Sequence, residues 1–127
     1  MPYVNKIEIM GNLGKDPELR YLGDQTATTS LSVAYTEKWN DKQSGQLQEH
    51  TEWFTVLLYG RHAEIVCERM KKGDCIMVWG KLKSRRYTDR SGNERTVYEI
   101  VAKEMQIIHT RQIADNTPLS GGIHDLM

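Results

Sequence analysis

The chain has 127 residues and carries 17 Lys and Arg against 17 Asp and Glu, so its formal net charge is zero. This length supplies one domain with a modest core and is too short for two independent cores. The hydrophobic content of 39% and the charged content of 27% are typical of a soluble globular protein, and no apolar run is long enough to span a bilayer.

The N-terminus and the cysteines bear on where the protein works. The first residues, "MPYVNKIEIMGNLG", contain neither a basic leader with an apolar segment nor a cleavage signal for secretion. Cys67 and Cys75 are eight positions apart and lack the spacing of zinc or redox motifs. We therefore expect a cytoplasmic protein with two reduced, buried cysteines and with no metal or cofactor.

The first half of the chain contains three segments that alternate apolar and polar residues, the period of half-buried β-strands. These segments are residues 4–13, residues 26–39 and residues 50–60. Turn residues follow the first segment, and the polar stretch 40–49 has the composition of a hairpin loop.

The period then changes to that of a helix. Apolar residues at positions i, i+3, i+4 and i+7 form one stripe, made of Ala63, Val66, Cys67 and Met70. This spacing predicts a helix of about three turns that ends at Gly73.

Alternation returns in residues 75–87, with a bend at Gly80, and in residues 95–108, after the turn sequence "TDRSGNE". A single helix between the third and fourth of five strands is the order of an OB-fold, an all-β five-stranded Greek-key barrel. We expect this domain over residues 1–109. Residues 110–127 have no sustained period, which predicts a short flexible C-terminal tail.

A local cluster of charge stands out from the neutral background. From Lys81 to Arg95 there are two Lys, four Arg, one Asp and one Glu, which gives 6 − 2 = +4. Side chains two apart on a strand share a face, so Lys81, Lys83, Arg85 and Tyr87 are predicted to line up. By the same rule Trp53 and Tyr59 share a face about 20 Å apart.

Aromatic side chains beside cations are what a protein needs to grip single-stranded nucleic acid, because bases stack on rings and phosphates meet Lys and Arg. The alternative for each residue is structural. A tryptophan in a small barrel often belongs to the core, as we expect for Trp79 unless it makes a subunit contact, and a Lys/Arg-rich hairpin often only protects an edge.

Residues 4–109 resemble the family of bacterial single-stranded-DNA-binding proteins. The resemblance is carried by "VNKIEIMGNLGKDPELRY", "TEKWNDKQSGQLQEHTEWFTVLLYGRHAEIV", "KKGDCIMVWGKLKSRRYTDRSGNERTVYEI" and "MQII". It implies an OB barrel and a homotetramer. It also implies non-catalytic, largely sequence-independent binding and protection of single-stranded DNA in replication, recombination and repair, at the nucleoid.

Site residues follow from the resemblance together with the strand pattern. The implied stacking residues are Trp39, Trp53, Tyr59 and Tyr87. The implied phosphate-binding residues are Arg20, Lys42, Arg61, Lys72, Lys81, Lys83, Arg85 and Arg86. Phe54 and Met77 are assigned to subunit contacts.

The chain departs from the family in two places. Tyr59 and Tyr87 stand where the family often has Phe and Trp, although a tyrosine ring can still stack. Residues 110–127 contain only Asp115 and Asp125 as acids, whereas the family carries a strongly acidic tip that recruits replication and repair proteins. Such recruitment is therefore not predicted here.

Two other functions remain open, and an enzymatic one is not expected. Stacking and cations would also serve an RNA-binding OB protein, and primosomal replication-restart adaptors share the barrel. A metal-dependent nuclease would have to use Glu64 and Glu68 or Asp16 and Glu18, but such pairs are usually solvated surface charges. We expect no enzyme.

Overall fold

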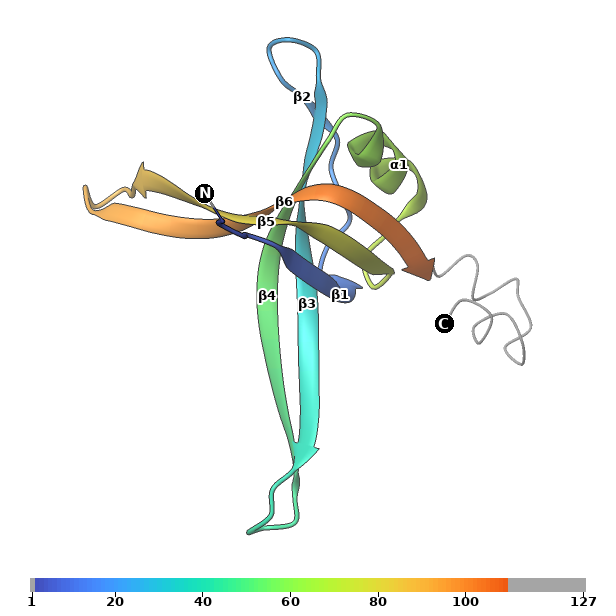
Figure 1. The fold of residues 1–127 in the computed structure, drawn as a ribbon, viewed down its shortest axis with the longest axis vertical. Coiled ribbons are helices and arrows are strands. Elements are labelled where there is room, and N and C mark those ends of the chain that lie inside the picture. The colour runs from blue at the N-terminus through green and yellow to red at the C-terminus, as the bar shows by residue number, and fades with distance from the viewer. Residues whose placement is uncertain (1, 110–127) are drawn as a thin grey trace.

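The computed structural model describes residues 2–109, and the tail predicted for residues 110–127 lies outside the described residues (Figure 1). The elements in chain order are β1 (Ile7–Leu13), β2 (Arg20–Tyr21), β3 (Ala27–Asn40), β4 (Leu47–Tyr59), α1 (Arg61–Arg69), β5 (Cys75–Thr88) and β6 (Glu94–His109). In this part of the chain, α1 falls well short of the length and apolar character that a bilayer span requires.

The strands form one sheet in the order β1-β5-β6-β4-β3-β2, and an additional pairing of β1 with β3 closes it. All pairings are antiparallel except that of β4 with β6, where Val56 lies opposite Ile100 and Leu57 opposite Val101. Five strands therefore close the barrel, with α1 between β4 and β5, which confirms the predicted OB-fold. The two-residue β2 was not predicted, since it is too short to show a period.

The core contains apolar residues that recur at every second position of the strands. Leu31 and Val33 of β3 meet Val56 and Leu58 of β4, and Ile76, Val78 and Ile100 complete the interior. From α1, Ala63 and Val66 pack against this cluster together with Met70, the residue that follows the helix. Three of the four residues of the predicted stripe are therefore in the core, while Cys67 is only partly buried.

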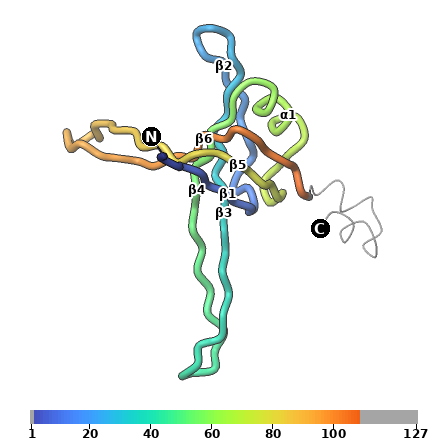
Figure 2. Tube along the Cα trace, viewed as in Figure 1, coloured from blue at the N-terminus to red at the C-terminus, as the bar shows by residue number. Residues whose placement is uncertain are grey.

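Two ribbons extend beyond the barrel. The outer halves of β3 and β4 form one hairpin, the outer halves of β5 and β6 form the other, and the two leave the barrel in different directions (Figure 2). A β-bulge between Trp79 and Gly80 marks the start of the second ribbon and confirms the predicted bend. Leu82 shares the core side of β5, but it lies beyond the barrel and is 41% exposed.

Three local predictions were wrong. The helix ends at Arg69 because Met70 already has an extended backbone, and Gly73, with φ of 95°, instead shapes the turn before β5. The hairpin loop is shorter than expected, because Asn40 and Leu47 still pair. Cys67 and Cys75 are free but only partly buried.

Candidate nucleic-acid interface

Trp53 and Tyr59 project from the outer face of the barrel, as their shared parity predicted. Register places Trp53 opposite Ala34 and Tyr59 opposite Thr28. The rings are 59% and 42% exposed, while Val56 and Leu58, on the other face of the same strand, are fully buried. Both rings therefore stand on a backbone that the core holds in place.

Small side chains of β3 lie beside the row that carries the two rings. On β3 the outer face carries Thr28, Ser30 and Ser32, opposite Tyr59, Leu57 and Thr55 of β4. We call this surface, from Trp53 to Tyr59 with the β3 hydroxyls beside it, the outer strip. Because no large side chain projects from β3 here, the ring faces are accessible along the strip.

The outer strip continues onto the β5–β6 ribbon. Ser30 lies opposite Leu57, Leu57 opposite Val101, and Val101 opposite Lys81. Paired residues share a face of the sheet, so Lys81 and, two and four residues on, Lys83 and Arg85 follow the same side. The register is therefore consistent with the predicted alignment of these cations with Tyr87. The row that they form continues the face of the sheet that carries Trp53.

The cations of this ribbon are partly neutralised by neighbouring carboxylates. Arg85 donates two hydrogen bonds to Glu99, from Nε at 3.3 Å and from Nη2 at 3.2 Å. Arg86 pairs with Glu94 at 3.5 Å. Glu99 lies outside the window from 81 to 95, so including it lowers the charge of the ribbon from +4 to 4 − 1 = +3.

Arg85 also positions the ring at the end of the ribbon. Its guanidinium carbon lies 5.9 Å from the centroid of the Tyr87 ring, within range of a cation–π contact. The hydrogen bonds and the charge of Glu99 raise the pKa of Arg85, so this side chain stays charged. Tyr87 itself is 42% exposed and can accept a base on its other face.

Asp89 organises the turn that follows Tyr87. Its Oδ1 accepts hydrogen bonds from the backbone N–H groups of Ser91 and Asn93, each at 2.9 Å. Its Oδ2 accepts one from Nε of Arg95 at 2.9 Å. The bond from Arg95 and then the backbone bonds lower the pKa of Asp89. Asp89 thus holds the turn through three hydrogen bonds.

Trp39 lies on the other face of the β3–β4 ribbon, which separates it from Trp53. It pairs with Gln48, in the same alternation as Glu37 with His50 and Tyr35 with Glu52. The Tyr35 hydroxyl donates to Glu37 at 2.8 Å, and His50 pairs with Glu52 at 2.7 Å. Trp39 therefore shares an acidic face and, in a single chain, does not lie with the other three predicted stacking residues.

The remaining predicted cations are dispersed. Arg20 of β2 shares the outer face with Thr28, its partner in register. Lys42 is exposed in the loop of the first ribbon, and Lys72 is exposed after α1. Arg61 begins α1 and pairs with Glu64 at 3.3 Å, in a shallow hollow that Glu68 also lines. Of these four, only Arg20 is brought to the outer strip.

The two residues assigned to subunit contacts both lie near Met10 of β1. Phe54 is partly buried against the core and lines a hollow with Ile7, Met10 and Tyr35. Met77 lies opposite Met10 in the pairing of β5 with β1.

Several residues of the interface were missed by sequence reasoning. Gly14 lies beneath the Trp53 indole, Lys15 follows it, and Glu99 pairs with Arg85. Tyr98 is 65% exposed, but its partner Ser84 places it on the opposite face of the ribbon from Arg85. Within residues 2–109, no group of three His, Cys, Asp or Glu side chains has the geometry to hold a metal ion.

Known proteins of similar sequence identify the family of this chain. The model of the single-strand binding protein family matches residues 4–108. The chain belongs to the single-strand binding protein family. One relative, single-stranded DNA-binding protein 1 of Xylella fastidiosa (strain 9a5c), is 47% identical over 124 residues, which cover 98% of this chain and 90% of that protein.

Solved structures of single-strand binding proteins share the fold. A structure described as a Plasmodium falciparum SSB complex with ssDNA superposes with a TM-score of 0.72 at 23% sequence identity. The match covers 84% of this chain and 94% of that one. At this identity the likeness supports the barrel and its topology.

Proposed function

We propose that this single-strand binding family member is a non-catalytic protein that binds and protects single-stranded DNA, largely independently of sequence, in replication, recombination and repair at the nucleoid. The observation that carries the proposal is the outer strip, where two exposed rings stand on one rigid face. A protein that stacks bases needs rings whose faces reach solvent, and the core side of β4 supplies the rigidity.

Binding combines two contacts that do not read sequence. Every base has a π-face, so Trp53, Tyr59 and Tyr87 can each stack any base. Phosphates then meet cations along the ribbon, at Lys81, Lys83 and Arg85, whereas Arg86 alternates onto the opposite face with Tyr98 and lies outside this path in a single chain. Trp39 and Lys42 belong to the β3–β4 ribbon. They contact DNA that passes around the end of this ribbon or crosses to its acidic face, where Trp39 lies. Zero net charge does not oppose this, because a local field acts within a Debye length of about 8–10 Å.

We propose a homotetramer as the working form. Ile7 to Asn12 pair with β5 along one edge of β1, while only Asn12 and Leu13 pair with β3 on the other. Within the described residues, the first part of β1 therefore has an open edge that a second copy can extend. Met10, which is 43% exposed, lies opposite Met77, and Phe54 lines the hollow beside it.

Light scattering tests the assembly directly. A mass four times that of the 14.7 kDa chain is expected. A mass near that of one chain would contradict the tetramer, whereas DNA binding could still stand.

A fluorescence titration tests the binding function. Oligo(dT), oligo(rU) and a duplex of equal length are added to the protein at several salt concentrations, and tryptophan quenching is followed. Trp53→Ala is expected to weaken binding to oligo(dT) by about 5- to 150-fold, since one stacked base contributes about 1–3 kcal/mol. Tyr98→Ala, an exposed aromatic on the opposite face of the second ribbon, serves as the control and should bind normally.

The three nucleic acids separate the alternatives. Quenching by oligo(dT) alone supports the proposal, and stronger binding to oligo(rU) would favour an RNA-binding protein. Equal binding to the duplex, or normal binding by Trp53→Ala, would contradict stacking on the outer strip.

A further inference from the structure

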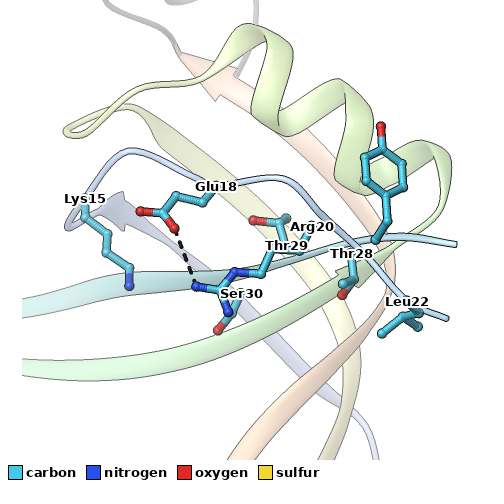
Figure 3. Close-up of a pocket in the computed structure, with 8 residues that line it drawn as sticks. Lys15, Glu18, Arg20, Leu22, Thr28, Thr29 and Ser30 are labelled. Atoms are coloured by element: carbon cyan, nitrogen blue, oxygen red, sulfur yellow. Dashed lines mark ion pairs between the residues drawn. The ribbon is translucent and has the colours of Figure 1, made fainter. Parts of the chain in front are cut away.

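A pocket of about 510 Å³ opens between β2, the segment that leads into it, and β3. Its lining includes two cations, Lys15 and Arg20, the hydroxyl side chains of Thr28 and Ser30, and the carboxylate of Glu18. Figure 3 shows the side chains of Lys15 and Arg20 reaching from this segment toward β3. The second ribbon, with its cations, lies on the other side of β4.

Register fixes this pocket beside the outer strip. Arg20 lies opposite Thr28, and Thr28 lies opposite Tyr59, so the three form one row across adjacent strands. About 10 Å separates the Cα atoms at the ends of that row, given a strand spacing near 4.8 Å. One end of the pocket is therefore next to the Tyr59 ring.

The other end of the pocket is next to Trp53. The N–H of Gly14 donates to the carbonyl of Ser32 at 2.8 Å, which holds this segment along β3. The Trp53 indole lies over Gly14, and Lys15 is the next residue. A nucleic acid strand that places bases on Trp53 and Tyr59 therefore passes along the pocket.

The groups in the pocket are available to an anion. Among the described residues, none pairs with the Lys15 ammonium, and Arg20 has only an exposed pair with Glu18 at 3.6 Å. Such an exposed pair is weak and is readily exchanged for another anion. By contrast, Arg85 on the ribbon makes two hydrogen bonds to Glu99, whose side chain is 13% exposed.

The hydroxyls differ in what they can offer. Thr28 donates its proton to the carbonyl of Leu58 at 3.1 Å. Ser30 is exposed on the same face, and in the described part of the chain no hydrogen bond occupies its hydroxyl. Ser30 can therefore donate to a phosphate oxygen, between the two cations.

We propose that the Lys15–Arg20 pocket is a phosphate subsite, which holds the DNA backbone between the bases stacked on Trp53 and Tyr59. This inference rests on the proposed function and adds a path to it, because the backbone runs on the β2 side of the strip there, away from the ribbon. Lys15 and Arg20 contribute two positive charges and Glu18 one negative charge, which leaves +1. Glu18 thus weakens the subsite until phosphate displaces it from Arg20.

Salt dependence of binding to oligo(dT) tests the subsite. Lys15→Gln and Arg20→Gln are each expected to reduce the slope of log Kobs against log salt concentration by about 0.7, the value for one phosphate contact on a single strand. The affinity should fall about fivefold at 0.1 M salt for each. Arg69→Gln, which removes one charge from the last turn of α1, is the control and should leave the slope unchanged.

Glu18→Gln gives a test with the opposite sign. It frees Arg20 and removes the negative charge, so tighter binding and a steeper slope are expected. The four substituted residues, Lys15, Glu18, Arg20 and Arg69, are all exposed, so circular dichroism should show unchanged folding of each variant.

The outcomes separate the subsite from the proposed function. If the parent chain binds oligo(dT) through Trp53 but Lys15→Gln and Arg20→Gln keep the parent slope, the subsite is refuted and the function stands. If the parent chain does not bind oligo(dT), the proposed function fails and the subsite with it. A loss of slope equal to that of Arg69→Gln would also refute the subsite, since it would reflect total charge.

Discussion

The indole of Trp53 lies directly over Gly14, so that a Cβ atom on Gly14 would overlap the ring atom Cζ3 and approach Cη2 to 2.9 Å. The absent side chain is what leaves room for the ring at this position. Gly14 does not have a positive φ, so a glycine is needed here because a side chain would clash with the ring, and not because of the backbone conformation. The position of this ring on β4 therefore depends on Gly14, which lies in the connection between β1 and β2.

Gly14→Ala is expected to move the Trp53 ring without unfolding the protein. The ring is more than half exposed and can swing outward, so the free energy of unfolding should change by about 0.5 kcal/mol or less. Binding to oligo(dT) should weaken, by less than the loss of about 1–3 kcal/mol expected for Trp53→Ala. Fluorescence titration measures the affinity, and thermal denaturation measures the stability.

Two variants make this test specific. Gly23→Ala adds the same methyl group in open space and should bind like the parent. In a Trp53→Ala background, Gly14→Ala should have no further effect, since a double-mutant cycle isolates coupling between neighbours. An equal loss in both backgrounds would contradict the positioning role of Gly14.

Much of the barrel and of the outer strip could be predicted because apolar and polar residues alternate along the strands, and this alternation shows which side chains face the core. Val56 and Leu58 had to face the core, which left Trp53 and Tyr59 outside. The face of Trp39 follows from the same period, since Trp39 shares the parity of the core residues Leu31 and Val33 on β3, whereas Trp53 has the parity opposite to Val56 on β4. The period could not predict its partner across the strands, because the register set by the loop between Asn40 and Leu47 pairs Trp39 with Gln48.

Charge was harder to predict than shape. Counting residues 81–95 finds the cations, but Glu99 is 14 positions from Arg85 and reaches it only because the hairpin returns. Lys15 gave no signal either, since it lies before the two-residue β2, where no periodic pattern exists. These contacts come from tertiary structure, and a single sequence does not reveal them.

Glu99→Gln is expected to strengthen DNA binding. The substitution keeps the shape of the side chain and one oxygen acceptor, but it removes the charge that Arg85 now neutralises through two hydrogen bonds. If the freed Arg85 takes up one phosphate, the salt slope should steepen by about 0.7 and the affinity should rise about fivefold at 0.1 M salt. Titration of oligo(dT) across salt concentrations measures both.

Glu68→Gln, on the exposed side of α1, is the matched control and should bind like the parent. The pairing model would be wrong if Glu99→Gln kept the parent slope while Arg85→Gln lowered it.

The order of the β5–β6 turn is expected to depend on acid pH through Asp89. Its pKa in the folded chain is lowered below the ordinary value of 3.8, first by Arg95 and then by the backbone of Asn93. Because the pKa of Asp89 is lower in the folded chain, ionised Asp89 stabilises the folded turn. This stabilisation is fully present above pH 3.8 and is lost as the pH falls through the folded pKa. NMR amide shifts of Ser91 and Asn93 should therefore titrate with a midpoint below 3.8.

Arg95→Gln removes the largest cause of that shift. The midpoint should move toward 3.8 in this variant, while the two backbone hydrogen bonds keep it from reaching that value. A midpoint at or above 3.8 in the parent chain would show that the Asp89 contacts do not form in solution.

Gly80→Ala is expected to destabilise the barrel where β5 passes into the ribbon. Gly80 sits at the bulge opposite Ala102, and a Cβ there would overlap the carbonyl oxygen of Val101 and lie 2.8 Å from its carbon and 2.9 Å from Cα of Ala102. These are backbone atoms of a paired strand and cannot swing aside as the Trp53 ring can. Overpacking of this kind costs about 1–3 kcal/mol.

Thermal unfolding at fixed protein concentration measures the effect. The Tm of Gly80→Ala should fall by about 4–8 °C for each kcal/mol, because a domain of this size has a small entropy of unfolding. Gly23→Ala meets no atom within 4 Å and should unfold like the parent. Equal Tm values for the two variants would mean that the strands can separate at the bulge at no cost, and the ribbon would then be a hinge instead of a rigid extension of the outer strip.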